Sequence, residues 1–203
     1  MTRTTLSLLG ALALTTLASA APINFDFKDP KGVNNVVFKA DAPLESVNGT
    51  ASGISGTVAF DPENPGATTG KIVVAANTMH VGNPTMKEHL HGDQWLNVAK
   101  FPEITFELVS LKNVKTEASV TTADATGKFT LKGVTKEITA PIKLTFLKDK
   151  LSQRQPGKQG DLLVVRSTFS IKRGDFGINS GRMEDKVANV IELNLSVAGN
   201  APR

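Results

Sequence analysis

The chain has 203 residues, a formal net charge of +4 and no cysteine. The lack of cysteine excludes disulfides, thiolate metal sites and cysteine nucleophiles. Lysines and arginines alternate with acidic and polar residues instead of forming one basic stripe, which argues against nucleic acid as a partner. Ten phenylalanines against no tyrosine and one tryptophan predict an apolar interior that holds few hydroxyl groups.

The first twenty residues have the pattern of a cleaved export signal. Arg3 supplies a positive charge, 6–17 is an apolar stretch, and 18–20 (Ala-Ser-Ala) is a small-residue cleavage site. The apolar stretch is shorter than the roughly 20 residues of a spanning helix. We therefore expect a signal peptide over 1–20, cleavage after Ala20, one mature domain over 21–203, and a location in the periplasm or outside the cell.

Apolar and polar residues alternate along most of the mature chain, as in strands with one buried face. In the segment 162–172 the odd-numbered residues form the apolar face and the even-numbered residues the polar face. Such alternation predicts an antiparallel all-β fold, either a closed barrel or a two-sheet sandwich. The predicted strands are 25–28, 36–40, 44–51, 57–60, 71–76, 103–108, 128–132, 142–146, 162–172 and 191–197.

One segment is predicted to be helical. Asn83 suits the N-cap, Pro84 suits the first helical position, and Met86 and Leu90 share a face. We expect this helix to lie across one end of the sheet, either as a gate or as a fixed plug. Segment 148–160, rich in lysine, glutamine and glycine, shows no periodicity and is predicted to be a mobile surface loop.

Three histidines form the cluster that most suggests a metal site: His80, His89 and His91, with Glu88 and Asp93 nearby. Residues two apart on a helix point about 200° apart, so His89 and His91 do not face one ion. There is no G-x-S-x-G elbow and no glycine-rich phosphate loop. We expect no catalytic residues, no metal and no cofactor, with a lipid-processing hydrolase that uses the histidines as the minor alternative.

Phenylalanine recurs on the apolar faces of separate predicted strands, at Phe27, Phe60, Phe106, Phe129, Phe146 and Phe169. An eight-stranded barrel can enclose a small ligand, whereas a sandwich fills its core with interdigitated side chains. The pattern by itself supports a solid core and a ligand cavity equally.

Five motifs, taken in their order along the chain, resemble the YceI-like polyisoprenoid-binding family. They are GTVAFDP at 56–62, MKEHL at 86–90, WLNVAKFPEITF at 95–106, GKFTLKGVTK at 127–136 and RGDFGI at 173–178. Together they extend over nearly the whole mature chain. The resemblance implies an eight-stranded, antiparallel, lipocalin-like barrel, exported to the bacterial periplasm, that holds an amphipathic isoprenoid or similar lipid. It implies no catalytic residues and no metal.

The resulting prediction is a binding protein that sequesters or carries such a lipid, with a short helix at the barrel mouth. Its expected partner is a long-chain isoprenoid or another amphipathic lipid. We expect no nucleic acid and at most transient contact with a membrane. The chain is expected to be a monomer or a homodimer. At the mouth, His89, His91, Trp95 or Arg173 is expected to contact a head group. The alternative is a solid-core β-sandwich that acts as an envelope interaction or stress protein without a ligand. The predicted ligand-binding residues are Phe27, Phe60, Ile72, Val74, Met86, His89, Leu90, Trp95, Ile104, Phe106, Leu108, Phe129, Leu131, Leu144, Phe146, Val165, Phe169, Ile171, Arg173 and Leu193.

Overall fold

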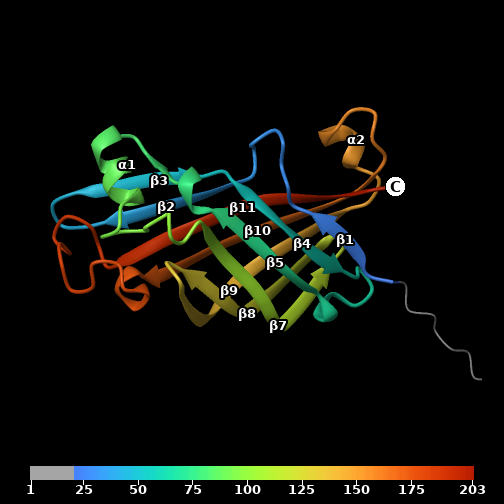
Figure 1. The fold of residues 1–203 in the computed structure, drawn as a ribbon. Coiled ribbons are helices and arrows are strands. Elements are labelled where there is room, and N and C mark those ends of the chain that lie inside the picture. The colour runs from blue at the N-terminus through green and yellow to red at the C-terminus, as the bar shows by residue number, and fades with distance from the viewer. Residues whose placement is uncertain (1–20) are drawn as a thin grey trace, which may run out of the picture.

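The computed structural model describes residues 21–203, and the predicted signal peptide at 1–20 lies outside the described residues. The described part is mostly β-sheet, and all strand pairs are antiparallel (Figure 1). The strands are β1 (Ile23–Asp26), β2 (Asn35–Asp41), β3 (Ser46–Ala51), β4 (Ile54–Phe60), β5 (Thr69–Ala75), β6 (His80–Val81), β7 (Glu103–Glu117), β8 (Val120–Leu131), β9 (Val134–Leu147), β10 (Gly160–Lys172) and β11 (Val190–Pro202). The helices are α1 (Pro84–His91) and α2 (Leu151–Arg154), with 3₁₀ turns η1 (Pro65–Ala67), η2 (Ala76–Thr78) and η3 (Arg173–Phe176).

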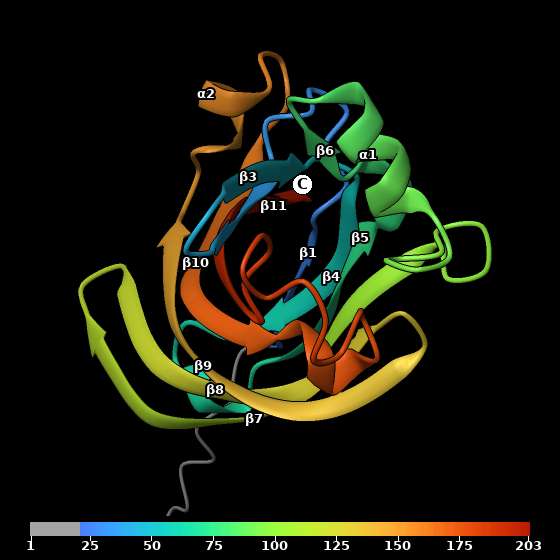
Figure 2. The same cartoon turned by 90° about the vertical axis from the view of Figure 1, so that its left-hand side faces the viewer.

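The sheet closes on itself because β11 is paired along both edges. One edge pairs with β10, and the other pairs with β2 near the start of β11 and with β1 near its end. The consecutive strands β1 and β2, β3 and β4, and β5 and β6 each share one place in the wall, which makes an eight-stranded barrel (Figure 2). The predicted barrel is confirmed, and the alternative of a two-sheet sandwich is wrong.

The pairing of β10 with β11 runs without a break from Gly160↔Pro202 to Lys172↔Val190. This register turns the odd-numbered residues of β10 toward the interior, as the alternation predicted. Leu162 is an exception to the predicted polar face, because it is buried although its number is even. Helix α2 contacts both β10 and β11.

The hairpin of β7 and β8 is longer than the sequence predicted, and its tip extends beyond the barrel wall (Figure 2). The register shifts twice, between Leu108 and Ser110 and between Lys112 and Lys115. Each bulge inserts an unpaired residue and so breaks the period of two. The turn after β8, at Lys132 and Gly133, has positive φ at both residues, as a tight two-residue hairpin turn requires.

One end of the barrel is filled by aromatic side chains. Phe25 and Phe27 are completely buried, and Phe60 is buried beside them. The ring of Phe146 packs edge-to-face on Phe25 at 6.2 Å and lies 6.0 Å from Phe60. Rings at these distances and angles are favourable pairs, so this closed end is a solid core.

A polar network ties the chain together at the same closed end. The Asn34 amide donates to the carbonyl oxygens of Phe27 and Ala198, and its own oxygen accepts from the Ala198 N–H. Arg154 of α2 donates to Asn34 and to Asp29. The prediction of a loop without regular structure over 148–160 is therefore wrong in part, since α2 lies within it and Leu151 is buried.

The opposite end carries the predicted helix, which is confirmed as α1. The Asn83 side chain accepts from the Met86 N–H at 3.0 Å, Pro84 begins the helix, and Gly92 ends it. Segment 177–189 lies at the same end of the barrel as α1 (Figures 1 and 2). No helix within residues 21–203 is long and apolar enough to span a membrane.

Candidate ligand-binding cavity

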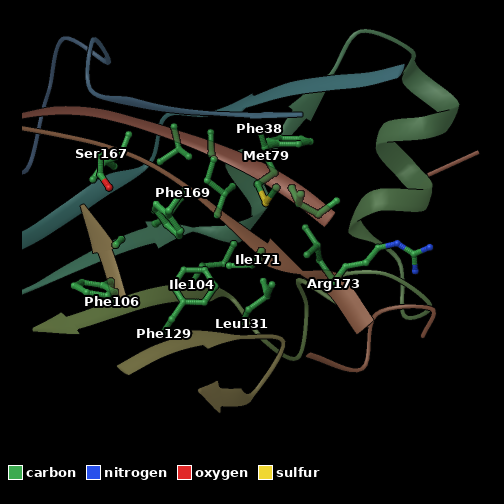
Figure 3. Close-up of a pocket in the computed structure, with 18 of the residues that line it drawn as sticks. Phe38, Met79, Ile104, Phe106, Phe129, Leu131, Ser167, Phe169, Ile171 and Arg173 are labelled. Carbon is green, nitrogen blue, oxygen red and sulfur yellow. The ribbon is translucent and has the colours of Figure 1, made fainter. Parts of the chain in front are cut away.

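The barrel encloses a cavity of about 460 Å³ between the closed end and α1. This volume falls within the roughly 300–1,000 Å³ of small-molecule sites. Strands around the whole barrel supply its walls, and α1, residues 95–96 and segment 178–187 supply its mouth. Figure 3 shows the apolar side chains converging on it from opposite walls.

Most of the predicted ligand-binding residues line this cavity. The three exceptions are Phe27, Phe60 and Phe146, which pack in the closed end instead. Strand alternation identifies the face on which a side chain lies, but it does not tell how far along the barrel axis that side chain stands. The predicted residues that line the cavity are Ile72, Val74, Met86, His89, Leu90, Trp95, Ile104, Phe106, Leu108, Phe129, Leu131, Leu144, Val165, Phe169, Ile171, Arg173 and Leu193.

The part of the wall made by β2 and β3 was not among the predicted ligand-binding residues. Val36, Phe38 and Ala40 alternate along β2 and line the cavity, as do Val47 and Ala51 of β3. Their alternation lies inside predicted strands and provided the signal that was needed. Residues of the mouth segment, Ile178, Met183, Lys186 and Val187, were also missed, and no periodicity marks them.

Two groups of aromatic rings lie at the cavity, and all of them except Phe176 line it. Phe129 contacts Phe169 edge-to-face at 6.3 Å and Phe176 edge-to-face at 5.5 Å, so these rings hold one another near the mouth. Phe38 and Phe106 stand on facing walls (Figure 3). Deep in the cavity Ser167 contributes a hydroxyl, but it donates to the carbonyl oxygen of Pro141 at 2.7 Å. The interior therefore offers a ligand almost entirely apolar contacts.

Arg173 holds the backbone of the mouth segment through its side chain. Its side chain is 2% exposed, and its Cζ lies 5.5 Å from the centre of the Trp95 ring, a cation–π distance. Burial lowers the pKa of Arg173, while Glu184 opposes the shift. Its five N–H groups all donate to backbone carbonyls at 2.5–3.1 Å, so no donor is free for the head-group contact that the sequence suggested. The acceptors are Ile178, Asn179, Arg182, Val187 and Ala188.

The histidines are spread around the mouth. His89 lines the cavity and is exposed, whereas the His91 Nε2 lies 2.7 Å from the carbonyl oxygen of Met79 and stands outside the lining. His80 is exposed in β6. Within residues 21–203 no group of three or more histidine, cysteine or acidic side chains is placed to hold a metal ion.

The sequence is similar to those of proteins in one known family. A family model described as the YceI-like domain matches residues 29–198. Protein YceI of Salmonella arizonae is 32% identical over 151 residues, which cover 74% of this chain and 72% of that protein, and Protein YceI of Salmonella newport matches to the same extent.

Solved structures show the same fold. BcnA of Burkholderia cenocepacia superimposes with a TM-score of 0.65 at 18% identity, over 81% of this chain and 95% of that one. A polyisoprenoid binding domain from Saccharophagus degradans gives a TM-score of 0.62 at 12% identity, over 89% and 99%. Because the family model spans most of the chain and the curated relatives exceed 30% identity, the chain belongs to the YceI-like domain family.

Proposed function

We propose that this protein holds an amphipathic isoprenoid or a similar lipid in its barrel and carries or sequesters it outside the cytoplasm. The observation that carries the proposal is the apolar cavity, which is closed at one end by packed phenylalanines and bordered at the other by α1 and segment 177–189. Membership of the YceI-like domain family and the fold shared with a polyisoprenoid binding domain support it.

The cavity binds by removing an apolar chain from water. Each Å² of apolar surface buried contributes about 25 cal/mol, so a chain that fills the lumen is retained without strong polar contacts. The closed end limits the length that fits, and the wall limits the width. Selectivity in this proposal comes from shape, and the protein needs no catalytic group to perform it.

The head group of the lipid stays at the mouth in this proposal. His89 and Lys186 line the cavity there and are exposed, so their polar atoms reach both the ligand and solvent. Arg173 acts indirectly, because it shapes segment 177–189 and has donated all its N–H groups. A head group that accepts hydrogen bonds, such as a hydroxyl or phosphate, fits these two side chains.

The proposal is tested by extracting the purified native protein with organic solvent and analysing the extract by mass spectrometry. Phe169 and Thr168 are neighbours in β10 that face the lumen and the outer surface respectively, which provides matched variants. Phe169→Asp places a buried carboxylate in the lumen, so we expect it to lose the lipid. Thr168→Asp should retain it. Wild-type extracts that contain no apolar-chain lipid would contradict the proposal.

Export is the second element of the proposal, and it rests on the signal pattern of residues 1–20. We expect the mature N-terminus at Ala21 and recovery of the protein from the periplasm or the medium. N-terminal sequencing of protein from the native host decides the matter. A chain that still begins at Met1 in the envelope fraction would count against export.

A further inference from the structure

Two phenylalanines of the cavity wall lie directly on glycines of neighbouring strands. The Cζ atom of Phe38 is 2.1 Å from the position that a Cβ atom would take at Gly49, and that of Phe106 is 2.4 Å from the corresponding position at Gly127. Ordinary van der Waals contact needs 3.4–4 Å. Each ring therefore occupies space that any other residue type would fill with its own side chain.

These contacts follow from the register of the sheet. Phe38 of β2 is paired directly with Gly49 of β3. Phe106 of β7 lies diagonally across from Gly127 of β8, whose partner is Leu108. Both glycines are buried and face inward, so each ring rests against the wall instead of projecting into the lumen. Glycine weakens a strand interior. Glycines at these two positions therefore lower the stability of the sheet.

We propose that Phe38 and Phe106, seated on Gly49 and Gly127, set the width of the lumen and make the protein prefer methyl-branched chains to straight ones. This inference rests on the proposed function, because it assigns the shape selectivity of the same cavity. A methyl branch needs lateral space that a straight chain does not need. Rings held against the wall leave this space, and rings displaced inward remove it.

The molecule contains a matched control at its closed end. Gly199 meets the ring of Phe27 in the same way, with Cε2 at 2.6 Å and Cζ at 2.8 Å from the Cβ position. Phe27 packs in the closed core and does not line the cavity. A substitution at Gly199 therefore reproduces the clash with a ring without changing the width of the lumen.

The experiment is a competition between phytanol and hexadecanol, which have the same main chain and differ only in the methyl branches of phytanol. The mature protein is loaded from an equal mixture, and the ratio of the two alcohols in its extract is measured by mass spectrometry. A ratio is insensitive to the folded fraction of a variant. We expect the wild type to prefer phytanol, and Gly127→Ala and Gly49→Ala to lower the ratio roughly tenfold, a typical effect of methyl-sized changes in an apolar pocket.

A Cβ atom at residue 127 also lies 2.6 Å from the Glu107 carbonyl oxygen, and one at residue 49 also meets the His80 carbonyl oxygen. Two further variants at the first of these positions separate the ring from the backbone. Leucine lacks the Cζ and Cε2 atoms that the new Cβ would meet. Gly127→Ala combined with Phe106→Leu should therefore restore the preference for phytanol, and Phe106→Leu alone should raise it. Gly199→Ala should leave the ratio unchanged.

The possible failures are distinguishable. If the wild type binds neither alcohol, the proposed function is overturned and this inference with it. If the wild type binds them but Gly49→Ala, Gly127→Ala and Phe106→Leu all keep its ratio, the inference alone is overturned. An equal fall of the ratio in Gly199→Ala would likewise overturn it, because the cause would then be general destabilisation.

Discussion

The two ends of the barrel share the long strands β9, β10 and β11 but are packed in opposite ways. At the closed end Phe25 and Phe27 are completely buried and contact other apolar side chains from every side. At the mouth α1 contains no buried residue, although Met86 and Leu90 face the cavity. Alternation of apolar residues is thus compatible with a filled interior and with an open one, and the difference lies in where the large rings are placed.

The ends also differ in how polar groups stabilise them. Asn34, Asp29 and Arg154 join segments far apart in the chain at the closed end. At the mouth Arg173 binds the carbonyl groups of one continuous segment, 178–188. The first network closes the barrel, and the second gives shape to a loop that no sheet hydrogen bonds hold. We infer that stability is concentrated at the closed end and adaptability at the mouth.

The largest expected effect on the free energy of unfolding comes from removing an aromatic ring, and it should differ between the two ends. Phe27→Ala should lower the free energy of unfolding by about 3–5 kcal/mol, because it leaves a cavity in a solid core. Phe169→Ala should cost about 1–2 kcal/mol, because its ring is half-buried and already borders the lumen. Urea unfolding of lipid-free protein measures both values. Equal losses would show that the interior is uniformly packed and would remove the distinction between the ends.

The next largest effect is expected at Arg173. Arg173→Ala removes a donor from five carbonyl oxygens, of which that of Asn179 still accepts from the Arg182 N–H. We therefore expect a loss of about 3 kcal/mol and faster amide exchange in residues 178–189. Arg173→Lys keeps the charge but has fewer donors and no planar fork, so it should restore only part of the stability. Hydrogen exchange followed by mass spectrometry locates the change. Unaltered exchange in 178–189 would contradict the assigned role.

The sequence predicted the barrel well because most strands obey a strict period of two. It failed where the period is broken or where the chain is held by polar contacts. Residues 109–117 were missed because two bulges break the period of β7. Residues 120–127 of β8 keep the period, but their buried face consists of threonine, alanine and glycine, which do not mark it as apolar. Helix α2 was missed because its four residues are too few for a helical period, and Leu151 alone anchors it in the core.

The candidate site was predicted to a similar degree. The face of each strand residue followed from alternation, so residues such as Phe106 and Ile171 were placed correctly on the cavity wall. Alternation does not indicate how deep along the barrel axis a side chain lies. Phe60 and Phe146 were therefore assigned to the cavity although they close its end. The carbonyl acceptors of Arg173 come from an aperiodic segment, whose path no local pattern specifies.

If α1 gates the mouth, we expect a smaller effect, on the rate of lipid exchange. Gly82 and Gly92 flank the helix, and no residue of α1 is fully buried, so it can move at modest cost. Cysteines placed in α1 and in segment 177–189, at positions with Cα atoms within about 7 Å, would join the two. Oxidation should slow lipid exchange roughly tenfold, a change of about 1.4 kcal/mol, and reduction should reverse it. Equal exchange rates with the crosslink confirmed by mass would indicate a fixed plug.

The smallest effect is expected from Asp29, and it should depend on pH. Burial by itself raises the pKa of Asp29, but hydrogen bonds from three backbone N–H groups and the charge of Arg154 outweigh it, so the net pKa lies below the ordinary value of 3.8. A carboxyl whose folded pKa is lowered stabilises the fold fully above its unfolded pKa and loses that contribution as the pH falls through its folded pKa. Asp29→Asn should therefore cost about 1 kcal/mol near neutral pH, and the difference from wild type should vanish in strong acid.

Urea unfolding of wild type and Asp29→Asn across a series of pH values measures this difference directly. Arg154→Gln serves as the companion variant, because it removes the ion pair at 3.1 Å but leaves the backbone donors in place. The charge of Arg154 is the last of the causes that lower the pKa, so Arg154→Gln should leave most of the pH dependence intact. A difference between wild type and Asp29→Asn that stays constant into strong acid would show that the closed end gains nothing from the charge of this carboxylate, and that its polar network contributes through shape alone.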